Sequence, residues 1–145
     1  MGSTLEYRVG ATDTGAAGIT SVVDGRDLID LVTEFEAERG WEPAGGYGPL
    51  IPAFFNFGDL KSYFLGQDEH QWPSSGQAWL LGCECGEVGC WPLEVRVHID
   101  SRTVTWTDFA QPFRRERDYT GLGPFIFDRA QYEQSVEAVV EALSN

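Results

Sequence analysis

The spacing of apolar residues predicts a helix near the start of the chain. In the segment 26–40, "RDLIDLVTEFEAERG", apolar residues recur at intervals of three and four, which is typical of an amphipathic helix. They are Leu28, Leu31, Val32 and Phe35. Asp24 suits the N-cap, and Gly40 suits the position after the last helical residue. The Asp24-Gly25 dipeptide before this helix also predicts a turn.

A second helix is predicted over 128–143, "DRAQYEQSVEAVVEAL". Asp128 and Gln131 have the spacing of a capping box, in which two side chains satisfy the backbone at the start of a helix. The predicted apolar stripe consists of Tyr132, Val136, Val139 and Leu143. One or two further helical turns are expected in 58–66, "GDLKSYFLG".

Strands are predicted in five segments: 4–9, 19–23, 77–85, 90–100 and 103–109. The segment 77–85 is apolar on both faces, which is typical of a central strand. Apolar and polar residues alternate over 94–99, which is typical of a half-buried strand. Between the first helix and the third strand, residues 41–66 form a connection rich in glycine, proline and aromatic residues. Such a connection either covers the core or lines a pocket.

This order of elements predicts an α+β fold. We expect an antiparallel sheet of about five strands with helices packed mainly on one face. The length of 145 residues fits one domain, 1–145, with a core of ordinary size.

The net charge of the chain limits the classes of molecule that it is expected to bind. The net charge is −13, which argues against nucleic acid because most of the surface would repel phosphate. An acidic surface suits a basic protein partner. The basic cluster Arg114, Arg115 and Arg117 is interrupted by Glu116, and we interpret it as a solvated turn.

The sequence also predicts a location. No apolar run reaches the length of a membrane span, and the first residues lack the pattern of a signal peptide. A cytoplasmic protein is therefore expected, in which thiols stay reduced.

All three cysteines of the chain, Cys83, Cys85 and Cys90, lie in the eight-residue segment 83–90, "CECGEVGC". If "GEVG" is a four-residue hairpin turn, Cys85 and Cys90 face each other across two strands. Cys83 lies two residues away on the same face. The three sulfurs would then converge near the turn.

Such a cluster predicts a candidate metal site, with zinc as the candidate ion. Zinc takes four ligands from Cys, His or carboxylate, and the spacing C-x-C-x4-C supplies three. His98 is separated from Cys90 by eight strand residues, roughly 26 Å at ~3.3 Å each, and is out of reach. His70 lies in "GQDEHQWP" and can fold back, whereas Glu84 points away and Glu87 lies in the turn. The predicted ligands are therefore Cys83, Cys85, Cys90 and His70.

Three other interpretations of the cysteines stay open. Cys85 and Cys90 can form a redox-active disulfide across the hairpin. One thiol can act as a nucleophile if a base lies beside it. The sequence favours a fourth interpretation, in which cysteine is a small residue that packs in a buried strand beside glycines.

One carboxylate has an unusual predicted environment. The alternation of 103–109 places Asp108 on the same face as Val104 and Trp106, which is apolar. A buried carboxylate of this kind is a candidate acid/base group. The alternative is that Asp108 emerges into solvent where the strand ends.

Three stretches carry a resemblance to a known family: "LLGCECGEVGCWPLEVRV", "WTDFAQPFR" and "GLGPFIFDRAQYEQSV". With its C-x-C-G-x-x-G-C-W hairpin and its G-P-F-x-F-D-R-x-Q-Y helix start, the chain resembles a family of small uncharacterised bacterial proteins. The resemblance covers most of the chain from about residue 23 onward. It implies the same order of elements, and because the family has no established activity it implies no catalytic residues.

Three functional hypotheses follow. The first is a small acidic binding protein without catalysis that contacts a basic partner through 41–66 and the loops beside the cysteines; its charge is similar to that of antitoxin or immunity proteins. The second is a thiol-based metal or redox module built on Cys83, Cys85 and Cys90. The third is a small enzyme with Asp108 as acid/base group and a pocket under 54–64.

Overall fold

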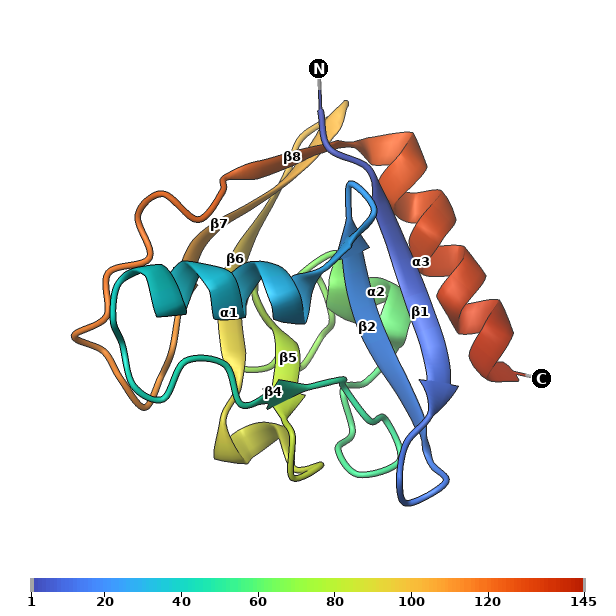
Figure 1. Ribbon diagram of the computed structural model, residues 1–145. Helices are drawn as coiled ribbons and strands as arrows, with labels where there is room; N and C mark the ends of the chain where they lie inside the picture. Colours follow the sequence, from blue (N-terminus) through green and yellow to red (C-terminus); the bar gives the residue numbers. More distant parts are fainter. Residues whose placement is uncertain (1, 145) are drawn as a thin grey trace.

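The strands and helices follow one another in the order that the sequence predicts, with three short strands added. The structure is a computed structural model that describes residues 2–144 (Figure 1). The strands are β1 (Leu5–Ala11), β2 (Ala17–Val23), β3 (Arg26–Asp27), β4 (Tyr47–Gly48), β5 (Gln77–Cys83), β6 (Leu93–Ile99), β7 (Thr103–Ala110) and β8 (Phe125–Asp128). The α-helices are α1 (Leu28–Glu38), α2 (Leu60–Phe64) and α3 (Arg129–Ser144), and a 3₁₀ helix, η1, spans Val88–Cys90. The predicted α+β class is confirmed.

The strands form two antiparallel sheets, with the orders β1-β2-β3 and β4-β5-β6-β7-β8. Isolated bridges join Ile19 of β2 to Leu50 and Ser3 to Phe127 of β8, so the two sheets meet at both edges. A five-stranded sheet is therefore present, but its membership differs from the prediction. β1 and β2 belong to the smaller sheet, and β4 and β8 complete the larger one. Strands of two and four residues are too short to show an alternating pattern.

Helix α1 begins later than predicted. Asp27, rather than Asp24, is its N-cap, and the Asp27 carboxylate accepts a hydrogen bond from the Ile29 N–H at 2.7 Å. Asp24 instead occupies the turn between β2 and β3, with a φ of 51°. The predicted end is confirmed: Gly40 follows the C-cap with a φ of 70°, and its N–H bonds to the Ala37 carbonyl.

Helix α3 lies along β1 and ties the two ends of the chain together (Figure 1). As predicted, Asp128 caps it and accepts a hydrogen bond from the Gln131 N–H at 3.1 Å. The Gln131 side chain does not complete a capping box. It bonds instead to the backbone N–H and carbonyl of Leu5, at 3.0 and 2.6 Å. A residue predicted to cap the start of a helix thus joins that helix to a strand.

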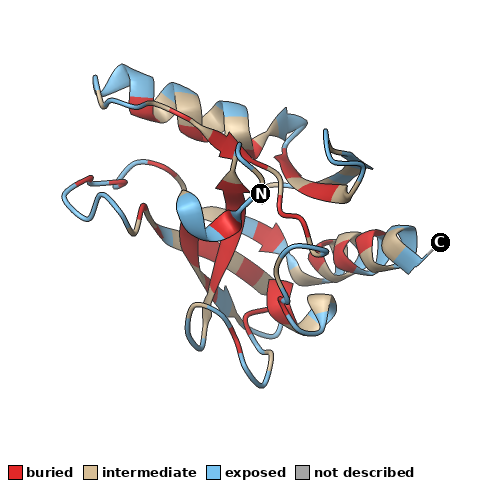
Figure 2. Ribbon diagram, turned by 90° about the horizontal axis from the view of Figure 1, so that it is seen from below, coloured by how far each residue is buried: buried red, intermediate tan, exposed pale blue. Residues whose placement is uncertain are grey.

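Buried residues line the inner sides of the strands and helices, whereas the outer sides are exposed (Figure 2). The largest fully buried side chains are Trp106, Tyr63, Tyr132, Phe64 and Phe127. Their polar atoms are paired within this core; for example, the Tyr63 hydroxyl donates to the Trp79 carbonyl at 2.7 Å. Strand β5 is central and buried along its middle, as predicted. None of the helices in the described part of the chain has the length and apolar character that crossing a bilayer requires.

The aromatic connection 41–66 both covers the core and lines a groove, the two roles that its composition suggested. Phe57, Tyr63 and Phe64 are buried in the core, and the last two belong to α2. Phe54, in contrast, is 49% exposed and lines a groove at the surface. This groove lies beside the cysteines.

Candidate functional site

The cysteines lie in a loop that is longer than the predicted hairpin. β5 ends at Cys83 and β6 begins only at Leu93, and η1 lies between them. The prediction that Cys85 and Cys90 face each other across two strands is therefore wrong, since neither belongs to a strand. The cross-strand neighbour of Cys83 is Tyr47 in β4.

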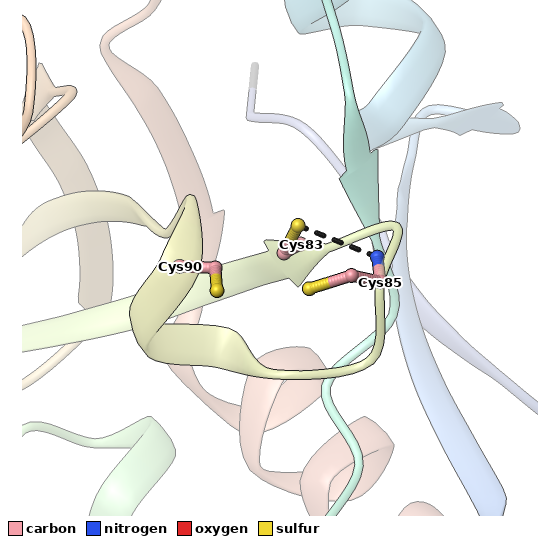
Figure 3. Close-up of side chains that lie close together, drawn as sticks. All are labelled: Cys83, Cys85 and Cys90. Atoms are coloured by element: carbon pink, nitrogen blue, oxygen red, sulfur yellow. Dashed lines mark hydrogen bonds between the residues drawn. The ribbon is translucent and has the colours of Figure 1, made fainter.

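The three sulfurs nevertheless converge: they all lie within 4.8 Å of one another (Figure 3). Two backbone hydrogen bonds fold the loop. The Gly86 N–H bonds to the Cys83 carbonyl at 3.0 Å, and the Cys90 N–H bonds to the Glu87 carbonyl at 3.1 Å. Gly86 has a φ of 99°, a conformation that glycine adopts without steric cost. This turn brings Cys85 and Cys90 to the same side as Cys83.

All three thiols are free, and they are accessible to different degrees. Cys85 and Cys90 are exposed and Cys83 is half-buried. The interpretation that the cysteines pack as small core residues is therefore wrong for Cys85 and Cys90. Exposed sulfurs contribute little to a core, so packing does not account for their convergence.

The surroundings of the three sulfurs give their thiols different pKa values. The thiols of Cys83 and Cys90 and the N–H of Glu87 lie beside the Cys85 sulfur and lower the pKa of its thiol, while the Cys85 backbone N–H donates to the Cys83 sulfur at 3.3 Å. Burial raises the pKa of Cys83. The hydrogen bond to Cys85 and the nearby Glu87 carboxylate raise the pKa of Cys90 to about 11. Cys85 therefore has the most acidic thiol of the three.

His70 does not join the cluster. The ligand atoms that lie within 4.8 Å of one another are the three sulfurs, without a nitrogen of His70. His70 is exposed, and its backbone N–H bonds to the Asp68 carboxylate at 3.0 Å. The next residue, Gln71, fixes this segment because its side-chain amide donates to the carbonyls of Tyr63 and Gln77.

The carboxylate of Glu87 contacts the cluster. The Cys90 sulfur donates to Glu87 Oε2 at 3.6 Å. Glu84, in contrast, lines a second hollow, together with Arg8, Cys83 and Cys85. The sequence placed both residues beside the cysteines but did not show which of them contacts a sulfur.

An aromatic groove of about 780 Å³ adjoins the cluster. Cys85 and Cys90 form part of its wall together with Glu87. Four aromatic residues also line it: Phe54, Phe55, Trp72 and Trp79. Trp72 is 45% exposed, so the groove presents apolar surface to solvent directly beside the thiols.

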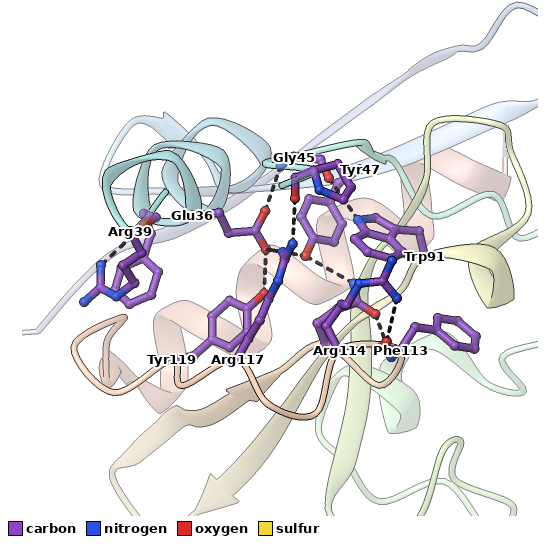
Figure 4. A network of polar contacts seen from close by, with 12 residues as sticks. Glu36, Arg39, Gly45, Tyr47, Trp91, Phe113, Arg114, Arg117 and Tyr119 are labelled. Atoms are coloured by element: carbon purple, nitrogen blue, oxygen red, sulfur yellow. Dashed lines mark hydrogen bonds and ion pairs between the residues drawn. The ribbon is translucent and has the colours of Figure 1, made fainter. Parts of the chain in front are cut away.

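A buried carboxylate, Glu36 of α1, is the centre of a network of polar contacts (Figure 4). It accepts hydrogen bonds from the Gly45 N–H and the Tyr47 hydroxyl, both at 2.7 Å, and from the Tyr119 hydroxyl at 2.5 Å. Arg117 pairs with it at 3.3 Å. Burial, with Glu36 nearby, raises the pKa of Tyr119 to about 12, so this hydroxyl stays a donor at neutral pH.

The Glu36 network corrects the interpretation of the basic cluster. The Arg117 side chain is only 3% exposed, so the expected solvated turn is wrong for this residue. Arg114 and Arg115 are exposed, as expected. Glu36 lies on the buried face of α1 together with the apolar residues Leu28 and Val32. The cation that pairs with it therefore comes from another segment of the chain.

The network also holds both sides of the cysteine loop. Tyr47 bonds to Glu36 and pairs with Cys83 across β4 and β5. Trp91, which follows Cys90, donates its indole N–H to the carbonyl of Gly45 at 2.9 Å. Gly45 in turn donates its own N–H to Glu36. One buried carboxylate thus fixes the backbone next to the first and the last cysteine.

Asp108 does not occupy the predicted environment. A β-bulge lies where Glu94 pairs with Ala110 but Arg96 pairs with Thr107, and Asp108 adopts a φ of 53° within it. The extra residue resets the alternation, so the Asp108 side chain is 71% exposed and lies 3.8 Å from that of Arg96. The prediction of an apolar environment is wrong, and the alternative of emergence into solvent is confirmed.

Comparisons with known proteins add no information on the family or function of this chain. No family model, no curated protein and no solved structure matches this chain. The resemblance to a family of small bacterial proteins therefore stays a prediction.

Proposed function

We propose that this protein binds a soft metal ion, Zn²⁺ in the first instance, through Cys83, Cys85 and Cys90. The observation that carries this proposal is the convergence of three accessible sulfurs within 4.8 Å. In a tetrahedral zinc site with Zn–S bonds of ~2.3 Å, neighbouring sulfurs lie about 3.8 Å apart. A small closure of an exposed loop is enough to reach that separation.

The chemistry of the cluster supports a metal more than a disulfide. A disulfide uses two sulfurs and gives no reason for the third, whereas thiolate sites for soft ions use all three. In the cytoplasm, the location we propose, thiols stay reduced and are available as ligands. Zn²⁺ binds thiolates, so it displaces thiol protons and its affinity rises with pH.

The test of this function is metal analysis of wild-type protein purified under reducing conditions without chelator. We expect about one metal ion per chain, and Co²⁺ added in place of zinc should give the near-ultraviolet absorption of sulfur-to-metal charge transfer. Zinc at about 100 times its dissociation constant should raise the free energy of unfolding by about 2.7 kcal/mol.

The control is the variant with serine at positions 83, 85 and 90. It should keep its circular dichroism spectrum, because two of the three side chains are exposed, but bind no Zn²⁺ or Co²⁺. Equal binding by the wild type and this variant would reject the proposal, as would three free thiols and no metal in the wild type.

A second candidate function is protein binding, supported by the exposed aromatic groove. Phe54 and Trp72 line one groove, and their side chains are 49% and 45% exposed. Exposed aromatic side chains that gather in one place are typical of protein contact surfaces. With a net charge of −13, a basic protein is the proposed partner, as for antitoxin or immunity proteins of similar charge.

A further inference from the structure

We infer that the carboxylate of Glu87 is the fourth ligand of the metal site and that it raises the affinity for Zn²⁺ but not for Cu⁺. This inference rests on the proposed metal function and adds a residue and a specificity to it. It also replaces His70. The group of ligand atoms that lie within 4.8 Å of one another contains neither His70 nor Glu87, but the Glu87 carboxylate contacts Cys90.

The first support is the distance between Glu87 and Cys90. The Glu87 Oε2 and Cys90 Sγ atoms lie 3.6 Å apart. A tetrahedral zinc ion with a sulfur at ~2.3 Å and an oxygen at ~2.0 Å holds those two ligand atoms about 3.5 Å apart. The pair therefore already has the separation that a shared zinc ion requires.

The second support is the local backbone. Glu87 directly precedes η1, and its carbonyl accepts the Cys90 N–H at 3.1 Å. Residues three apart in a 3₁₀ turn lie above one another, so the side chains of Glu87 and Cys90 are directed to the same side. Glu87 and the thiols of Cys85 and Cys90 also line the same groove. Because Glu87 is exposed, its side chain can turn toward all three sulfurs.

In the metal-free protein the same contact is a hydrogen bond from the Cys90 thiol to the Glu87 carboxylate. When Zn²⁺ enters, three thiols lose their protons to solvent, and the Glu87 carboxylate loses a hydrogen bond and gains a metal bond. One Zn²⁺ is exchanged for three protons, and the four ligands and the ion together carry a net charge of −2. No oxidation or reduction takes place.

The carboxylate oxygen provides the specificity. Zn²⁺ accepts oxygen ligands and fills four positions, whereas soft Cu⁺ selects sulfur. Without Glu87, three thiolates still form a complete sulfur site for Cu⁺ but an incomplete one for Zn²⁺. Glu87 is therefore expected to matter for one ion and not for the other.

The experiment compares full-length wild type, Glu87→Gln, Glu84→Gln and Glu87→His. Affinities for Zn²⁺ and Cu⁺ are measured by competition with chromophoric chelators under reducing conditions. Glu84→Gln is the matched control, because Glu84 is an exposed carboxylate of the same loop, whereas the carboxylate that contacts a sulfur belongs to Glu87. Glu87→His replaces the oxygen by another zinc ligand.

We expect Glu87→Gln to lower the Zn²⁺ affinity on the order of 10- to 100-fold, a range in which residues around metal sites commonly act. Glu87→His should restore it, and Glu84→Gln should leave it unchanged. Cu⁺ affinity should be equal in the wild type, Glu87→Gln and Glu84→Gln. Unchanged Zn²⁺ binding in Glu87→Gln, or equal losses for both ions, would overturn the role of Glu87 while the metal function stands. A wild type that binds neither ion would reject the metal function itself.

Discussion

Glu36 shows how one residue can decide the stability of a whole region. A fully buried carboxylate is very unfavourable unless charge and hydrogen bonds compensate for the lost water. Here one arginine, two tyrosine hydroxyls and one backbone N–H do so. The guanidinium of Arg117 also lies 5.3 and 5.8 Å from the rings of Trp41 and Trp91. The removal of the carboxylate charge therefore leaves a buried cation among aromatic rings.

We predict that Glu36→Gln lowers the free energy of unfolding by about 3 kcal/mol, because it removes one charged partner of a buried ion pair and leaves the other uncompensated. Urea denaturation followed by tryptophan fluorescence measures this change. The control is Glu34→Gln on the same helix. Glu34 pairs with Arg26, but both side chains are more than half exposed, so the loss should stay below about 1 kcal/mol. If the two variants lose the same stability, the Glu36 network has no special role.

At the scale of elements, the bulge in β7 determines which residues face the core. Phe109 is buried and Asp108 is exposed because the bulge shifts the register by one residue between Arg96 and Glu94. The cost is a left-handed backbone at Asp108, where the φ is 53°. Aspartate tolerates this conformation better than most residues, and glycine adopts it freely.

We predict that Asp108→Gly keeps the stability of the wild type to within about 1 kcal/mol, because the strain it removes offsets the loss of a solvent-exposed ion pair. Asp108→Val should lose about 2 kcal/mol, since a β-branched residue is strained at positive φ. Thermal unfolding of the two variants compares them directly. A valine variant as stable as the glycine variant would show that the bulge relaxes or is absent.

At the scale of the whole molecule, charge and the aromatic groove together define how a partner would bind. The net charge of −13 attracts any basic protein, and that attraction weakens as salt shortens the Debye length from ~10 Å at 0.1 M to ~3 Å at 1 M. Charge alone therefore gives association without selectivity. The groove beside the cysteines supplies apolar contacts that salt does not screen.

We predict that the immobilised protein retains a basic partner from a lysate of its own host, more at about 50 mM than at about 500 mM salt. A variant with Phe54 and Trp72 both changed to serine should lose this partner. The control is Phe113→Ser, which removes an aromatic residue that is 51% exposed but does not line the groove. Retention of the same proteins by all three forms would mean that charge alone acts, and retention of none would reject the partner hypothesis.

Local patterns determined much of this protein. The periodicity of α1 and α3, the N-cap at Asp128, Gly40 at the end of α1 and the central position of β5 were all predicted correctly. Each depends on residues a few positions apart, so the physical cause lies within the segment itself. The closeness of Cys83, Cys85 and Cys90 was also predictable, because a chain of eight residues that turns back keeps its ends near each other.

What only the tertiary structure decided depends on residues far apart in sequence. Glu36 and Arg117 meet across 81 positions (117 − 36), and neither one alone shows that it is buried. β4 and β8 are strands because β5 and β7 offer them backbone partners. His70 stays away from the sulfurs because Gln71 is bonded to Tyr63 and Gln77, and Glu87 comes near because η1 turns it toward Cys90. Sequence thus determined the periodic elements and the ligand types, and the fold determined which ligands meet, because burial and pairing arise only when distant segments pack.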